Sequence, residues 1–261
     1  MNITALSIPG ALLGAIVGSF LNVVILRLPD PEGSIVFPGS HCPGCGKPIR
    51  WFDNIPILSF FLLLGKCRGC SMKISWQYPV VETIMAGLGF FLFRTFPPVE
   101  ASIYFPFAAA LLAIIFIDAA HQIIPDVISL PGIVAGFLAS FFNPLVSWQS
   151  SSLGILAGGG SLYLIAMTYY LITRREGMGG GDIKLLAMIG AFLGWQALPF
   201  VVFGSSLLGT VVGIGAMIKQ GKGGKTVIPY GPFLSIAALV YLFFSVEIQQ
   251  FFIMFFLPPA S

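Results

Sequence analysis

The sequence predicts an all-α fold: a polytopic membrane helical bundle of about eight spans, with a small four-cysteine loop that binds zinc. Of the 261 residues, 57% are hydrophobic and only 9% are charged, with a mean hydropathy of +0.95. A soluble domain carries about 25% charged residues, so this chain lacks the charge to cover a soluble surface. Apolar stretches of about 20 residues indicate helical spans, and the alternating pattern of a membrane barrel is missing. The net charge of +3 is too small to indicate a nucleic-acid partner.

Each predicted span is an apolar run that ends at polar, charged or turn-forming residues. The first has no basic residue before it and is longer than a signal-peptide core, so we expect an anchor and not a cleaved leader. The sixth is short, and Pro199 separates it from the seventh. In chain order the spans are 5–26, 77–96, 101–118, 127–143, 152–173, 183–197, 198–218 and 232–257.

The basic residues predict the orientation of the spans in the membrane. Every Lys and Arg except Arg94 falls in one of the segments 27–76, 173–184 and 219–225. With eight spans, these three segments lie on one side, which the positive-inside rule makes the cytoplasmic side. Both termini are then expected to face outward.

Glycines recur at four-residue spacing inside several spans, which predicts close helix packing in lipid because small residues let two backbones approach. They are Gly10, Gly14 and Gly18 in the first span, Gly154 and Gly158 in the fifth, Gly190 and Gly194 in the sixth, and Gly209 and Gly213 in the seventh.

Two CxxC pairs, Cys42 with Cys45 and Cys67 with Cys70, predict a metal site in the loop 27–76. Four thiolates in two such turns can surround a zinc ion tetrahedrally, and a closed set of four leaves no open position, so the zinc would be structural. Two disulfides or four free thiols are the alternatives, but a reducing cytoplasmic side disfavours disulfides. With four cysteines present, His41 is expected to be a polar loop residue.

Two acidic residues stand out by their position. Asp118 follows the apolar run FAAALLAIIFI, and Asp182 opens the sixth span after GMGGG, so both are expected at the cytoplasmic membrane boundary. Taken alone, Asp182 is equally well explained as a helix N-cap. Asp118 opposes the dipole at a helix C-terminus, although an ion pair with His121 could compensate. For Asp126, at the start of the fourth span, the cap interpretation is favoured.

Two carboxyl groups brought together in a partly dry site share one proton, because both cannot easily ionise. One member can then activate water while the other protonates the leaving amine, as in aspartic proteases. The spacing of Asp118 and Asp182 alone does not bring them together.

Ordered motifs along nearly the whole chain resemble the type IV prepilin peptidases, a family of GxGD intramembrane aspartic peptidases. The GxGD stretch 179–182 is followed by IKLLAMIGAFLGW, and the CxxC pairs flank DNIPILS. The other matching segments are GSFLNVVILRLP at 18–29, ISWQYPVVE at 74–82, FID…IIPD at 116–126 and IPYGPFL at 228–234.

The resemblance implies a bacterial inner-membrane enzyme whose catalytic pair is Asp118 and Asp182. It implies that the enzyme cleaves the basic leader of prepilins and pseudopilins after glycine, and then N-methylates the new N-terminus with S-adenosyl-L-methionine. The chain would divide into an anchor (1–26), a zinc-binding methyltransferase region (27–76) and a peptidase core (77–261).

For the methyl donor, the residues that match family motifs are Asp53, Gly65, Lys66 and Glu82. Asp53 stands where many members have Glu in an ENIP motif, so its side chain is one methylene shorter. The sequence by itself contains no βαβ unit that would indicate such a site.

Other functions remain open from the residues alone. They are a peptidase without methyl transfer, a transporter or proton relay that uses the same aspartates, and a non-catalytic scaffold with a zinc module. Two apparent nucleotide motifs are rejected: GKGGKT at 221–226 lacks the first P-loop glycine, and GMGGGD has Asp182 in place of the third glycine of GxGxxG.

Overall fold

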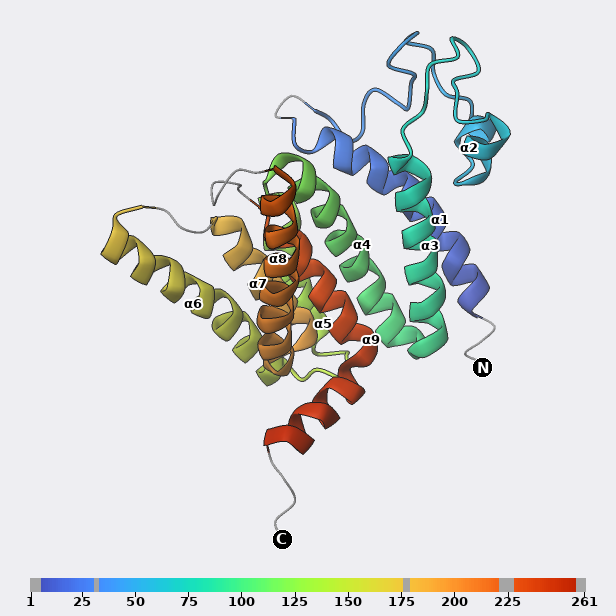
Figure 1. Ribbon diagram of the computed structural model, residues 1–261. Helices are drawn as coiled ribbons and strands as arrows, with labels where there is room; N and C mark the ends of the chain where they lie inside the picture. The colour runs from blue at the N-terminus through green and yellow to red at the C-terminus, as the bar shows by residue number, and fades with distance from the viewer. Residues whose placement is uncertain (1–5, 31–32, 176–178, 221–227, 257–261) are drawn as a thin grey trace. The chain divides into compact units, whose positions relative to one another are not determined.

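The computed structural model describes residues 6–30, 33–175, 179–220 and 228–256, and its regular elements there are helices (Figure 1). The all-α prediction is therefore confirmed. The elements are α1 (Ser7–Arg27), η2 (Trp51–Asn54), α2 (Leu58–Leu62), α3 (Gln77–Thr95), α4 (Pro98–His121), α5 (Asp126–Ala139), α6 (Trp148–Thr173), α7 (Gly180–Leu193), η3 (Trp195–Ala197), α8 (Leu198–Gln220) and α9 (Gly231–Phe256).

Each of the eight predicted spans corresponds to one helix in the described residues, namely α1 and α3 to α9. In the part of the chain that the structure describes, five stretches are long and apolar enough to cross a membrane by themselves: α1, α4, α6, α9, and α8 together with η3. Helices α5 and α7 have only 14 residues each, fewer than the roughly 20 that a span needs. The break before the seventh span comes at Gly194, whose φ of 78° ends α7, and not at Pro199, which lies inside the first turn of α8.

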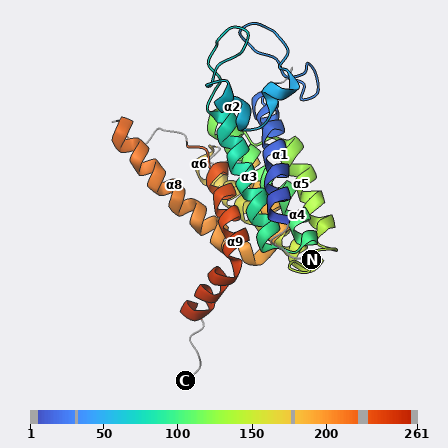
Figure 2. The same cartoon turned by 90° about the vertical axis from the view of Figure 1, so that its right-hand side faces the viewer.

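The chain forms two compact units, residues 1–113 and 114–261, and α4 contributes to both. In the first unit α1 and α3 run antiparallel and lie side by side (Figure 2). A Cβ atom on Gly10 would lie 2.7 Å from the Gly89 carbonyl oxygen, and one on Gly14 would overlap the Met85 carbonyl oxygen. The predicted glycine-mediated approach is thus confirmed for these helices, because any side chain there would push the backbones apart.

In the second unit α6 and α7 make the same kind of contact. Gly154 and Gly190 face each other so closely that a Cβ on either would overlap the carbonyl oxygen of the other. The Ser151 hydroxyl donates to the Ala191 carbonyl oxygen at 2.8 Å, which adds a polar link along the seam. Helix α5 packs on α7 as well, with Gly132 against Met188. Helix α7 is therefore held from two sides, and its residues from Leu185 to Leu193 are buried.

The α6–α7 seam predicts that Gly154→Ala destabilises the protein while Gly160→Ala does not. The new methyl group at residue 154 meets the α7 backbone, and overpacking of this kind costs about 1–3 kcal/mol. Gly160 lies on the same helix with open space where its Cβ would be, so alanine there gains about 0.5–1 kcal/mol of helix propensity. Thermal unfolding in detergent would measure both. Equal unfolding temperatures for the two variants would contradict the tight seam.

Candidate functional sites

The four predicted cysteines form two turns with the same hydrogen-bond pattern. In the first, the Cys42 N–H donates to the Lys47 carbonyl oxygen at 3.0 Å and the Gly46 N–H donates back to the Cys42 carbonyl oxygen at 2.8 Å. In the second, Cys67 and Met72 are joined at 2.8 Å, and the Ser71 N–H donates to the Cys67 carbonyl oxygen at 2.9 Å. Gly46 and Ser71 both have positive φ, 67° and 60°. The chain thus closes each CxxC into a tight turn that presents both sulfurs on one side.

The two turns bring all four sulfur atoms within 4.8 Å of one another, and the Cys42 and Cys70 sulfurs are 3.6 Å apart. Four sulfurs at about 2.3 Å from one tetrahedral zinc would be separated by similar distances. Backbone N–H groups of Cys45 and Gly44 lower the pKa of the Cys42 thiol to about 6. The cluster therefore has the ligand type and the spacing of a metal site. His41 is not part of it, and its Nδ1 lies 2.9 Å from the Gly39 carbonyl oxygen.

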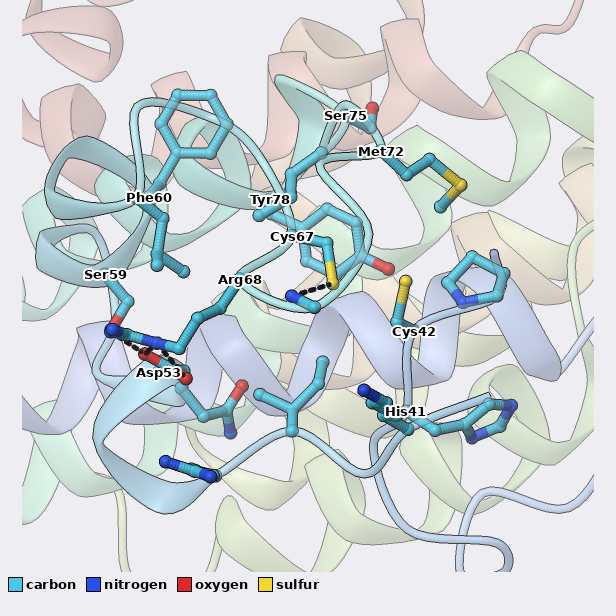
Figure 3. Close-up of a pocket in the computed structure, with 18 of the residues that line it drawn as sticks. His41, Cys42, Asp53, Ser59, Phe60, Cys67, Arg68, Met72, Ser75 and Tyr78 are labelled. Carbon is cyan, nitrogen blue, oxygen red and sulfur yellow. Dashed lines mark hydrogen bonds and ion pairs between the residues drawn. The ribbon is translucent and has the colours of Figure 1, made fainter. Parts of the chain in front are cut away.

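A cavity of about 630 Å³ lies beside this cluster, between the cysteine turns, η2, α2 and the start of α3. Its lining includes Cys42 and Cys67 on one side and Asp53 and Arg68 on the other (Figure 3). Most small-molecule pockets have volumes of about 300–1,000 Å³ with a few polar groups among apolar ones. The cavity therefore has room for a ligand of cofactor size.

The Asp53 carboxylate is held by an arginine that the sequence analysis did not single out. Arg68 donates to both oxygens of Asp53 through Nε at 3.0 and 3.1 Å and through Nη2 at 2.7 Å. This hydrogen-bonded pairing holds the pKa of Asp53 below its ordinary value. Because Arg68 stands between Cys67 and Cys70, the pair ties the second cysteine turn to η2. The arginine of the CRGC motif is visible in the sequence, but the sequence alone does not show that its partner is Asp53.

Glu82 also lines the cavity, from the first turns of α3. It is 6% exposed, and its Oε2 accepts the Ile57 N–H at 2.6 Å. Ile57 has a φ of 63°, which is strained for a β-branched residue, so this hydrogen bond helps to fix the turn into α2. The remaining two predicted residues, Gly65 and Lys66, lie in the turn after α2 and are outside the cavity lining.

The predicted catalytic residue Asp118 lies in the last turn of α4 and is 4% exposed. Its Oδ2 accepts a hydrogen bond of 3.0 Å from the N–H of Gly231, the first residue of α9. This contact resolves the apparent conflict with its own helix dipole, because the carboxylate faces the positive end of a second helix. The alternative ion pair with His121, which is exposed on the same helix, does not form.

Asp182 lies in the first turn of α7, where Gly179 is the N-cap residue, and within the described part of the chain no side-chain cap hydrogen bond forms there. The N-cap interpretation of Asp182 is therefore wrong, although its charge still suits the helix N-terminus. Among the described residues its carboxyl group accepts no hydrogen bond, and it is half-buried. Gly181, which precedes Asp182, and Gly231, which donates to Asp118, both lie against the Ile124 side chain, so the fold brings the two aspartates into one site within residues 114–261.

Ile124, in the segment between α4 and α5, lies against Gly181 and Gly231, the glycines adjacent to Asp182 in the chain and hydrogen-bonded to Asp118. A Cβ on Gly181 would be 2.9 Å from the Ile124 Cβ, and one on Gly231 would be 3.0 Å from its Cδ1. Gly181 precedes Asp182, so the Ile124 side chain explains why glycine is needed there. Sequence analysis missed Ile124 and Gly231 as parts of the site, although both lie in motifs that carry the family resemblance.

Asp126 does not cap α5, contrary to the sequence prediction, since it makes no cap hydrogen bond. Its two oxygens instead accept from the Lys184 Nζ at 2.7 and 2.8 Å. This pair joins the first residue of α5 to the first turns of α7. Lys184 is thereby engaged away from the aspartate pair.

Comparison with known families and proteins covers nearly the whole chain. The bacterial Peptidase A24 N-terminal domain matches residues 12–96, and the type IV leader peptidase family matches residues 105–214. Three similar curated proteins are each named prepilin leader peptidase/N-methyltransferase. The Dichelobacter nodosus protein is 37% identical (92% of each chain), the Pseudomonas aeruginosa protein 38% (94% of this chain, 92% of the relative) and the Neisseria gonorrhoeae protein 38% (88% and 87%). No solved structure gives a significant match.

The ion pair with Arg68 predicts that Arg68→Gln raises the pKa of Asp53 toward its ordinary value. Since the folded-state pKa is lowered, the pair stabilises the loop above the ordinary carboxyl pKa, and this contribution is lost as the pH falls through the lowered value. NMR titration of protein labelled at the aspartate carboxyl carbons would measure the midpoint. Arg50→Gln is the matched control, because Arg50 donates no hydrogen bond to Asp53 and its charge affects the Asp53 pKa less than Arg68 does. An unchanged Asp53 midpoint in Arg68→Gln would contradict the pairing.

Proposed function

This chain belongs to the type IV leader peptidase family, and from that membership we propose that it is a bifunctional membrane enzyme. As an aspartic endopeptidase it cleaves the basic leader from prepilins and pseudopilins after glycine. As an N-methyltransferase it then methylates the new N-terminal residue with S-adenosyl-L-methionine. The same membership and the candidate membrane spans make it a multi-pass membrane protein.

The common neighbourhood of Asp118 and Asp182 carries the peptidase part of this proposal, since Gly231, which donates to Asp118, and Gly181, which precedes Asp182, both lie against Ile124. Ionising both carboxyl groups is unfavourable at short range, so the pair holds one shared proton. The burial of Asp118 strengthens this effect, because a buried charge is less screened by water. A pair with one proton contains a base and an acid at the same time.

Peptide hydrolysis by such a pair needs one water molecule and no covalent intermediate. The ionised carboxylate takes a proton from water, whose oxygen attacks the carbonyl carbon of the scissile bond, while the protonated carboxyl group donates to the carbonyl oxygen. The resulting diol breaks the C–N bond as the protonated carboxyl group donates to the departing nitrogen and the ionised carboxylate takes a proton from one diol hydroxyl. The pair ends with one proton, as it began.

The position of the aspartates at helix ends supports cleavage at the membrane boundary. Asp118 lies in the last turn of α4 and Asp182 in the first turn of α7, so we propose that water reaches the pair from the loop side through the half-buried Asp182. We propose that this side faces the cytoplasm of a bacterial inner membrane, where the substrate's basic leader remains while its apolar segment lies in lipid. Gly180 has open space beside its Cα atom, which allows an extended substrate to approach Asp182 closely.

The four-cysteine cluster fits zinc, since four sulfurs within 4.8 Å of one another can serve as tetrahedral ligands. Cys42, Cys45, Cys67 and Cys70 would fill all four positions, which gives the ion a structural role. Zinc would fix the two cysteine turns and, through Arg68, the wall of the cavity that contains Asp53.

The adjacent cavity fits the methyl donor by its volume of about 630 Å³. Its lining combines two acids, Asp53 and Glu82, with the basic residues Lys47, Arg50, Arg68 and Lys73. When bound, S-adenosyl-L-methionine supplies an electrophilic methyl group on a positively charged sulfur. We propose that Asp53 and Glu82, the acidic residues of this lining, contact the ligand, Asp53 within its ion pair with Arg68 and Glu82 as the acid without an ion-pair partner in the lining. Gly65 and Lys66 would act from the turn that shapes its wall.

The aspartate pair predicts that Asp118→Asn and Asp182→Asn each lower precursor cleavage by at least about 100-fold, the lower range of a general acid or base contribution. The assay combines the purified protein in detergent with a prepilin whose basic leader ends in glycine. Asp126→Asn is the control, because Asp126 pairs with Lys184, and it should stay within a few-fold of wild type. Wild-type cleavage by either catalytic variant would reject the pair.

Mass spectrometry of the cleaved product tests the methyltransferase part in the same assay. With S-adenosyl-L-methionine present, the new N-terminus should gain one methyl group, and without it the mass should match the unmodified product. An unmodified N-terminus under both conditions would reject methyl transfer and limit the proposed function to peptidase activity.

The cysteine cluster predicts about one zinc ion per chain in protein purified with reduced thiols. Cys67→Ser should lose the metal, while His41→Ala should retain it because His41 lies outside the ligand set. Elemental analysis gives the stoichiometry, and reduced wild-type protein without bound metal would exclude the site.

A further inference from the structure

We propose that Gly231 is a positioning residue that keeps Asp118 ionised, so that Asp118 is the base of the pair and Asp182 carries the shared proton. This assignment rests on the proposed peptidase function. The N–H of Gly231 donates to the Asp118 Oδ2 at 3.0 Å, and this is the buried carboxyl group of the two. A hydrogen bond from an N–H to a carboxylate favours the charged form.

The two aspartates differ in this hydrogen bond. They do not differ in the helix end that they face, which is an N-terminus in both cases. Both face a helix N-terminus, Asp118 that of α9 and Asp182 that of its own α7. Only Asp118 receives a backbone N–H, since the Asp182 carboxyl group accepts no hydrogen bond among the described residues. The shared proton therefore goes to Asp182, where it removes the repulsion between the two groups.

Other charged groups around the site do not reverse this assignment. Lys184 of α7 is engaged by Asp126 of α5 at 2.7 and 2.8 Å. His121 of α4 is exposed and makes no ion pair with Asp118. Within the described residues, Asp118 therefore faces the charge of Asp182 from α7 and the N-terminus of α9.

The local sequence YGPFL leaves the Gly231 N–H available for this role. Pro232 has no N–H, and the N–H groups of Phe233 and Leu234 already donate to the Tyr230 carbonyl oxygen at 3.1 and 3.2 Å. The N–H of Gly231 would otherwise remain unpaired at the start of α9. The Asp118 carboxylate is thus the cap of this helix, supplied by another helix.

Two further contacts fix the donor and require glycine. The Tyr230 hydroxyl lies 2.6 Å from the Ser205 Oγ and 3.1 Å from the Ser206 Oγ, which anchors the residue before Gly231 to α8. A Cβ at residue 231 would lie 2.6 Å from the Asp118 Oδ2 and 3.0 Å from the Ile124 Cδ1. Any side chain at residue 231 therefore displaces the carboxylate that the N–H holds.

Hydrogen–deuterium exchange tests the hydrogen bond without relying on cleavage. In a peptide covering residues 228–234 the two prolines contribute no amide, so the Gly231 amide is one of few. Asp118→Ala should speed its exchange about tenfold or more, Asp118→Asn should give a smaller increase, and Asp182→Ala should leave it unchanged. Equal exchange in wild type and both Asp118 variants, or an effect of Asp182→Ala as large as that of Asp118→Ala, would overturn the assignment.

Kinetics test the consequence for the reaction. Gly231→Ala should lower kcat by about tenfold or more, with KM within about twofold, and should move the acid limb of the pH–rate profile to higher pH, because Asp118 then ionises less readily. Gly160→Ala, a glycine with open space on α6, should match wild type.

The double variant Gly231→Ala/Ile124→Ala separates steric pressure on Ile124 from displacement of Asp118. It should stay impaired and keep the shifted acid limb, since only the contact with Ile124 is relieved. Full recovery in the double variant, or a wild-type pH profile in Gly231→Ala, would overturn the role of Gly231. If Gly231→Ala does not fold, the exchange measurements on the Asp118 and Asp182 variants decide whether Gly231 holds the Asp118 carboxylate. Failure of the wild type to cleave any precursor rejects the proposed function instead, while the exchange result still reports on the hydrogen bond.

Discussion

Direct contact between helix backbones is the constraint on which the aspartate site depends. Helix α7 has Asp182 in its first turn and is too short to span a membrane by itself. Its position, and with it the position of Asp182, is therefore fixed by the neighbouring helices. The mutual approach of Gly154 and Gly190 holds α7 against α6, and Gly132 brings α5 to its other face. Without side chains at these points, dispersion contacts run along the whole seam, which is how helices associate where lipid offers no hydrophobic driving force.

The polar groups at the helix ends are satisfied by partners from other elements. Asp118 caps α9, Asp126 pairs with Lys184, and Tyr230 is bound to serines of α8. Each bond joins residues far apart in the chain, so together they align the ends of α4, α5, α7, α8 and α9. Within the described residues only Asp118 of the two aspartates receives a backbone N–H, and this bond is the basis of the different roles that we propose for them.

The cysteine loop uses a different principle, because its short elements have little core of their own. Two turns with matching hydrogen bonds place the four sulfur atoms close together, and the Asp53–Arg68 pair links one of these turns to η2. A metal in such a loop replaces the missing core, since its binding contributes directly to folding. The cavity beside it is formed by the loop together with the first turns of α3, so its shape depends on the order that the cysteine turns impose.

The sequence alone determined the membrane class, the helical segments and the paired CxxC turns, because composition, apolar run length and short spacings are local properties. Asp118 and Asp182 stood out by their position, but only the family resemblance predicted that they form a pair. The sequence also predicted the close glycine contacts of α1 and of α6 with α7, because a four-residue period is a local property. Of the other predicted glycines, Gly194 ends α7, and Gly209 and Gly213 meet only side chains. The sequence could not predict which residues the acidic side chains contact. Local rules gave Asp126 and Asp182 cap roles that neither has, whereas Asp118 caps a helix that begins more than a hundred residues later. Such contacts depend on how distant segments pack, and only the tertiary structure decides which helix N-terminus meets which carboxylate.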